Sequence, residues 1–241
     1  MRFRSVLLVA VGLAVLSAVA WLGQQRTVTS DPVLLTSGPP ADVAPAAAPE
    51  PGPTSRSASR TPVAPAAADP AWVRRTALAA GIPEPAVAAY ARATLGAPEG
   101  CDLGWTTLAG IGWVESHHAT IDGRTVGADG RPSTPIVGPA LDGTGPVAAI
   151  PVDGAWDRAT GPMQFITSTW QQWGRDGDGD GVADPQDLDD AAAAAAAYLC
   201  GTGYDLTTAA GWTAAVRAYN HSDAYVLAVH SAATTYAERT R

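Results

Sequence analysis

The chain has 241 residues and a formal net charge of −8, from 23 acidic and 15 basic side chains. This length is sufficient for one domain with its own hydrophobic core, and the negative charge excludes a nucleic-acid-binding surface. The acidity is local, because seven of the 23 acidic residues lie in one short segment: Asp176, Asp178, Asp180, Asp184, Asp187, Asp189 and Asp190.

Residues 1–23 have the pattern of an export signal. Two arginines, Arg2 and Arg4, precede an apolar run over residues 6–22, and Ala18-Val19-Ala20 fits a small-residue cleavage site. The run is close to the ~18–20 residues that cross a bilayer, so residues 5–22 are also compatible with an uncleaved membrane anchor. We therefore expect the rest of the chain to be secreted or held outside the cytoplasmic membrane.

Residues 24–69 are rich in Pro, Ala, Ser and Thr, which predicts a disordered linker. The remaining residues, 70–241, are expected to form a mainly α-helical domain. A long segment over residues 120–160 is dense in Gly, Pro and Asp and predicts an irregular loop with at most short strands. The expected helices span residues 71–80, 83–95, 103–116, 168–173 (capped by Ser168), 187–199, 209–219 and 222–239.

Glu115 is unusual because it lies in an apolar helical segment. Leu108, Ile111 and Glu115 have the spacing of residues on one helix face. Burial raises the pKa of a carboxyl group, which suits a general acid that works near neutral pH. The alternative is an ordinary glutamate that points to water at the end of a helix.

The acidic segment matches an EF-hand loop that begins at Asp176 and has its turn glycine at Gly181. The shorter side chain of Asp at the twelfth position, where Glu is usual, predicts modest Ca²⁺ affinity. The alternative is a solvated acidic turn without metal. The pattern predicts a structural Ca²⁺ bound by the side chains of Asp176, Asp178, Asp180 and Asp187 and by the carbonyl of Val182.

The two cysteines, Cys101 and Cys200, are expected to form a disulfide because the chain is exported. Two free thiols are the alternative. The bridge would join the start of the Glu115 helix to the end of the alanine-rich helix.

Three segments occur in the order seen in lytic transglycosylases: Glu115-Ser116, the Gly161–Trp170 stretch that contains Met163-Gln164-Phe165, and Ala218-Tyr219-Asn220. The acidic loop is similar to the calcium site of the membrane-bound lytic murein transglycosylase B family. The chain most resembles exported actinobacterial members of the SLT-domain type. The resemblance covers nearly all of residues 70–241 and implies a lysozyme-like fold.

The resemblance also implies an activity on peptidoglycan glycan strands. Glu115 would protonate the oxygen between N-acetylmuramic acid (MurNAc) and N-acetylglucosamine (GlcNAc), and would then act as base on the C6 hydroxyl of MurNAc. The product would carry a 1,6-anhydro ring. Asp122 and Asp157 have the settings of turn residues, so no second carboxylate is expected. The implied substrate contacts are Ser116, Met163, Gln164, Phe165, Tyr219 and Asn220.

Several of these residue roles, and the activity itself, have alternative interpretations. Ser116 and Asn220 also fit helix-end residues, Phe165 also fits a core residue, and His117 and His118 are expected to face solvent. A muramidase that admits water, and an inactive peptidoglycan-binding protein, would share the same fold. We expect the protein to be monomeric.

Overall fold

The computed structural model describes residues 67–144 and 149–241. The predicted export signal and all but the last residues of the predicted linker lie outside this part. The described residues belong to one compact unit. Within them the chain forms seven α-helices, and none is long and apolar enough to cross a membrane.

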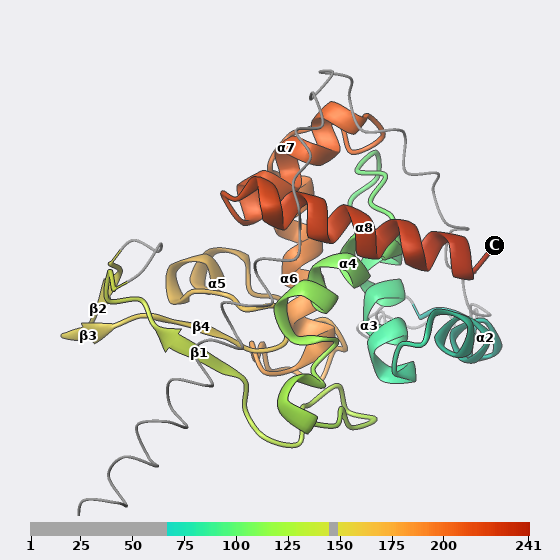
Figure 1. Ribbon diagram of the computed structural model, residues 1–241. Helices are drawn as coiled ribbons and strands as arrows, with labels where there is room; N and C mark the ends of the chain where they lie inside the picture. The colour runs from blue at the N-terminus through green and yellow to red at the C-terminus, as the bar shows by residue number, and fades with distance from the viewer. Residues whose placement is uncertain (1–66, 145–148) are drawn as a thin grey trace, which may run out of the picture. The chain divides into compact units, whose positions relative to one another are not determined.

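The first three helices are α2 (Pro70–Ala80), α3 (Glu84–Leu95) and α4 (Trp105–Ser116). The apolar sequence of α4 places it in the centre of the core, where Leu108 and Ile111 are fully buried. Its main partner is the long last helix, α8 (Asp223–Arg239), which crosses α4 in Figure 1. A Cβ atom at Gly110 would lie 2.7 Å from the carbonyl of Val229, so this glycine permits the close contact.

Two further helices complete the core. The alanine-rich α6 (Leu188–Gly201) packs against α3, because its small side chains allow two helices to approach closely. Helix α7 (Ala209–Tyr219) packs against α8. Helix α8 begins one residue after the predicted start and is capped by Ser222, whose hydroxyl accepts a hydrogen bond from the Tyr225 amide.

In the described part of the long segment between α4 and α5 the elements are short, as predicted. They are η1 (Ile121–Gly123) and two antiparallel pairs, β1 (Val137–Ala140) with β4 (Arg158–Thr160) and β2 (Pro151–Val152) with β3 (Ala155–Trp156) (Figure 1). After β4 the chain passes the end of the acidic loop at Gly161. A Cβ atom there would lie 1.6 Å from the Pro185 carbonyl oxygen, so only glycine fits.

Helix α5 (Thr167–Trp173) begins one residue before the predicted cap, Ser168. Its first turn is held by Asp157 instead. The carboxylate of Asp157 accepts hydrogen bonds from the amide (3.0 Å) and the hydroxyl (2.7 Å) of Thr167. A cap from a distant part of the chain cannot be recognised from local sequence, which explains the error.

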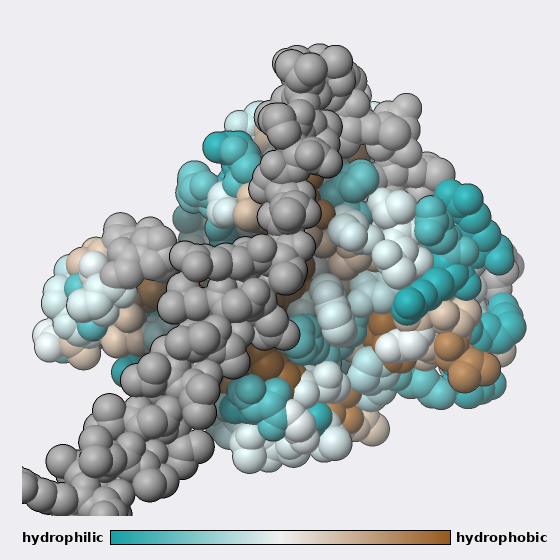
Figure 2. All heavy atoms as spheres, in the orientation of Figure 1, coloured by the Kyte–Doolittle hydropathy of each residue, from teal (hydrophilic) through white to brown (hydrophobic). Residues whose placement is uncertain are grey.

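The predicted disulfide is present and joins Cys101 to Cys200, with 5.5 Å between the Cα atoms. On the face that Figure 2 shows, one patch of hydrophobic residues lies over α2. Leu78 of α2, for example, is 88% exposed.

Candidate active site

Glu115 lies in the last turn of α4, and its carboxyl group faces the first turn of α8. The hydroxyl of Tyr225 donates a hydrogen bond to Oε1 of Glu115 over 2.7 Å. The ring of Tyr219, at the end of α7, stacks on Tyr225 with 6.5 Å between centroids and an interplanar angle of 7°. Three helix ends therefore enclose one half-buried carboxyl group.

This enclosure changes the acidity of Glu115. Burial raises its pKa to about 7, and the hydrogen bond from Tyr225 opposes this rise because it favours the ionised form. A carboxyl group with a pKa near 7 can both donate and accept a proton at neutral pH. The observed setting agrees with the prediction of an acid on an apolar face, although the side chain is half-buried and not fully enclosed.

Tyr219 also connects the site to the segment that follows β4. Its hydroxyl donates a hydrogen bond to the carbonyl of Met163 over 2.8 Å, and its ring meets Phe165 edge-on at 5.8 Å. The side chains of Met163 and Phe165 are buried in the core. Both side chains therefore pack in the core, and the substrate contacts that the sequence predicts for them stay predictions.

Ser116 is also a packing residue. Its fully buried hydroxyl donates to the carbonyl of Pro162 (2.7 Å) and accepts from the amide of Ala119 (2.9 Å). The hydroxyl joins the end of α4 to the segment after β4, and the predicted contact of Ser116 with substrate stays a prediction. Ser116 thus helps to place the backbone next to Glu115.

Gln164 and Asn220 are the more accessible members of the predicted set. Gln164 is half-buried, has a left-handed backbone (φ 51°), and donates from Nε2 to the carbonyl of Gly161 over 2.9 Å. Asn220 is exposed directly after α7. Sugar contacts by these two side chains stay predictions.

Tyr225 is a site residue that the sequence analysis missed. Its spacing of three residues from the helix cap Ser222 was visible, but nothing local shows that the first turn of α8 meets the last turn of α4. A tyrosine in an amphipathic helix is indistinguishable from an ordinary core residue until the packing of the helices is known.

The acidic loop brings three carboxylates together. Oxygen atoms of Asp176, Asp178 and Asp190 all lie within 4.8 Å of one another. Asp176 also holds the loop turn, because it accepts hydrogen bonds from the amides of Gly179 (2.7 Å) and Gly181 (2.9 Å). Three carboxylates at this separation are a suitable oxygen donor set for a hard cation such as Ca²⁺.

The third member of this cluster differs from the prediction. Asp187 caps α6 by accepting from the Asp189 amide (2.9 Å), whereas the buried Asp190 joins the cluster from the first turn of α6. Asp180 and Val182 are exposed, and the Asp180 carboxylate lies outside the cluster of described acidic residues. The twelve-residue EF-hand pattern pointed to Asp187, since it assumes that the loop closes before the helix begins.

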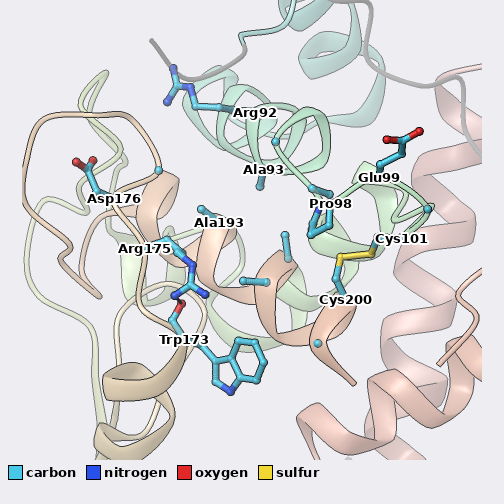
Figure 3. A pocket seen from close by; sticks show the side chains of 17 residues that line it. Arg92, Ala93, Pro98, Glu99, Cys101, Trp173, Arg175, Asp176, Ala193 and Cys200 are labelled. Carbon is cyan, nitrogen blue, oxygen red and sulfur yellow. Dashed lines mark hydrogen bonds between the residues drawn. A yellow bond between two sulfur atoms is a disulfide. The ribbon is translucent and has the colours of Figure 1, made fainter. Parts of the chain in front are cut away.

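A cavity of about 610 Å³ lies elsewhere on the domain, between α3, α6 and the disulfide (Figure 3). Arg92, Trp173 and Arg175 are part of its lining, as are both cysteines. Glu115, Tyr219 and Tyr225 do not line it. The cavity is therefore separate from the candidate acid.

With this geometry in place, comparison with known proteins gives one result. Residues 144–218 match the family model of the transglycosylase SLT domain. The match supports a lytic transglycosylase-type, lysozyme-like domain, and so suggests glycan cleavage with peptidoglycan as the substrate. Neither the search of curated proteins nor the search of solved structures found a match. The SLT match includes the acidic loop and Tyr198 but ends before Tyr219, and Glu115 lies upstream of it.

Many glycosidases use a second carboxylate, which activates water or attacks the sugar. The site is therefore compared with that two-carboxylate arrangement. The two other acidic residues considered from sequence have different surroundings. Asp157 is buried and accepts hydrogen bonds from Arg158 and Thr167, and the exposed Asp122 pairs with Arg124. Neither carboxylate is enclosed by aromatic rings as Glu115 is.

Proposed function

We propose that this protein is an exported peptidoglycan lytic transglycosylase that cleaves the β-1,4 bond between MurNAc and GlcNAc, with Glu115 as its single acid and base. The observation that carries this proposal is the Glu115 carboxyl group, which Tyr225 holds at a helix end with a pKa raised to about 7 by burial. The SLT-domain match supports the substrate class.

The proposed reaction has two proton transfers. Protonated Glu115 gives its proton to the glycosidic oxygen as the bond to C1 of MurNAc breaks, and GlcNAc leaves with a free 4-hydroxyl group. The ionised Glu115 then removes the proton from the C6 hydroxyl of MurNAc, and O6 bonds to C1. The product is a 1,6-anhydro ring, no water is consumed, and Glu115 is protonated again.

The reaction product tests this proposal directly. Purified peptidoglycan is digested with the protein, and the soluble muropeptides are weighed by mass spectrometry. We expect 1,6-anhydro ends, which lack one water relative to reducing ends. Reducing ends alone would indicate a muramidase, and an absence of any product in the presence of Ca²⁺ would contradict an enzymatic function.

Export, membrane attachment and oligomeric state belong to this proposal as well. A chain that acts on the cell wall must reach it, either after cleavage at Ala18-Val19-Ala20 or through an anchor at residues 5–22. We propose that it acts as a monomer in the cell envelope, secreted or anchored so that the domain faces the wall.

We further propose that the acidic loop binds a structural Ca²⁺ through Asp176, Asp178 and Asp190, with the predicted donors Asp180 and Val182 nearby in the same loop. The cation would offset the repulsion between the clustered carboxylates. Because it would bind only the folded protein, Ca²⁺ at 100 times its Kd would stabilise the fold by about 2.7 kcal/mol.

Replacement of Asp190 by Asn should remove most of the rise in melting temperature that Ca²⁺ produces. Asp187→Asn is the matched control, because Asn is also a good helix cap and Asp187 lies outside the cluster. Melting curves of both variants with Ca²⁺ and with chelator give the comparison. A full Ca²⁺ response in Asp190→Asn, or its loss in Asp187→Asn, would contradict the assignment of Asp190.

A further inference from the structure

His118 lies three residues after Glu115 and is only 2% exposed, in contrast to the solvent-facing position expected from sequence. Both ring nitrogens have a partner. Nδ1 lies 3.0 Å from the hydroxyl of Tyr90 on α3, and Nε2 lies 2.8 Å from the hydroxyl of Tyr236 on α8. Tyr90, His118 and Tyr236 are called the histidine clamp below.

The backbone at this point has an unfavourable conformation. His117, His118 and Ala119 have φ angles of 52°, 59° and 67°, so three successive residues without a glycine are left-handed. The amide of His118 donates to the carbonyl of Gly112 over 2.9 Å. Such a turn persists only where the surrounding structure holds it in place.

A glycine in α4 leaves space for one side chain of the clamp. A Cβ atom at Gly112 would lie 2.0 Å from the Tyr90 hydroxyl, so a glycine here allows Tyr90 to reach His118 past the last turns of α4. The clamp therefore joins α3 and α8 through His118, two residues after the end of α4. Helix α8 also carries Tyr225, the hydrogen-bond partner of Glu115.

The clamp needs a neutral imidazole. Burial, together with the neighbouring His117, lowers the pKa of His118 to about 3. In the neutral ring one nitrogen donates a hydrogen bond and the other accepts one. A tyrosine hydroxyl can do either, so one tyrosine accepts from the ring and the other donates to it. All polar atoms of the buried ring are then satisfied, which favours one fixed position of the turn.

We propose that His118 is a positioning residue for Glu115: the histidine clamp fixes the left-handed turn after α4 and so aligns the Glu115 carboxyl group with Tyr225. This inference rests on the proposed function of Glu115. His118 itself does not take part in the chemistry, because it is buried and both nitrogens are occupied.

The main test variant is His118→Phe, which keeps a ring of similar size and removes both hydrogen bonds. Tyr236→Phe removes only one of them and serves as a second variant if His118→Phe does not fold. His117→Asn is the control, because His117 is exposed and Asn tolerates a left-handed backbone. For His118→Phe we expect kcat on a soluble glycan to fall about 10- to 100-fold with little change in KM, a smaller fall for Tyr236→Phe, and no fall for His117→Asn.

Two readouts separate positioning from general stability. Rates are measured well below the melting temperature of each variant, and the Glu115 carboxyl is titrated by NMR. If His118 positions Glu115, the pKa of Glu115 in His118→Phe moves from about 7 toward the ordinary 4.5, because the carboxyl group leaves its enclosure. A lower melting temperature with unchanged kcat and an unchanged titration would overturn the proposal.

The same titration separates this inference from the proposed function. If the wild-type protein releases no muropeptides, the enzymatic function fails. The Glu115 titration still decides whether the clamp positions that carboxyl group, since it requires no substrate.

Discussion

Replacement of Glu115 by Gln is expected to reduce release of muropeptides by about 10²- to 10⁴-fold or more, with little change in the fold. Glutamine has nearly the same shape and still accepts the hydrogen bond from Tyr225, but it has no acidic proton for the leaving oxygen. The measurement is muropeptide release from purified peptidoglycan, with circular dichroism as the check of folding. Glu84→Gln, on an exposed glutamate of α3, is the control and should retain activity.

The pH dependence follows from the same residue. Because the first step requires protonated Glu115, the rate should fall as pH rises through about 7. The folded-state pKa is above the ordinary value of 4.5, so the stability that Glu115 contributes is fully present below pH 4.5 and is lost as pH rises through about 7.

Tyr225→Phe refines this prediction. The Tyr225 hydroxyl lowers the pKa of Glu115, so its removal should raise that pKa further and move the fall in rate to higher pH. An active Glu115→Gln variant, or a rate in the wild-type protein that rises steadily through pH 7, would refute the role of Glu115 as the acid.

Loss of the disulfide is expected to produce the largest change in stability. Cys101 and Cys200 are 99 residues apart in sequence, and for a loop of this length the bridge removes about 4–5 kcal/mol of entropy from the unfolded state. In a domain of this size that corresponds to a fall of about 10–15 °C in melting temperature. We expect this result for the double variant Cys101→Ser, Cys200→Ser.

Thermal unfolding of the double variant, with and without reductant, gives the measurement. The wild-type protein treated with reductant should behave like the double variant, and the double variant itself should not respond to reductant. A change of only a degree or two in the double variant would show that the bridge adds little to a core already held by α3, α4 and α6.

Much of the architecture follows from local patterns. The helical periodicity and the alanine run of α6 predicted the helices to within a few residues, because these signals act over one or two turns. The start of α5 differs from the prediction because Asp157, which holds its first turn, lies between β3 and β4, ten positions before Thr167. Of the predicted site residues, Glu115 and Tyr219 are near each other, and Asp176 and Asp178 lie together.

One physical cause explains why several side chains have other neighbours than the sequence indicates. Ser116, Met163 and Phe165 share motifs with Glu115 or Gln164, yet their side chains serve packing, since adjacent residues in a motif point in different directions. Asp190 replaces Asp187 in the acidic cluster because the first turn of α6 rotates its side chain toward the loop. His118 is buried because α3 and α8 each supply a tyrosine to it.

The helical class, the acidic loop and one carboxyl group in an apolar helix are predictable from local sequence, since they depend on residue type and spacing over short distances. The partners of that carboxyl group are visible only once the helices are packed. Tyr225, Tyr219 and the histidine clamp reach Glu115 and its neighbouring turn from three other helices, and the burial that raises the Glu115 pKa exists only when those helices pack together.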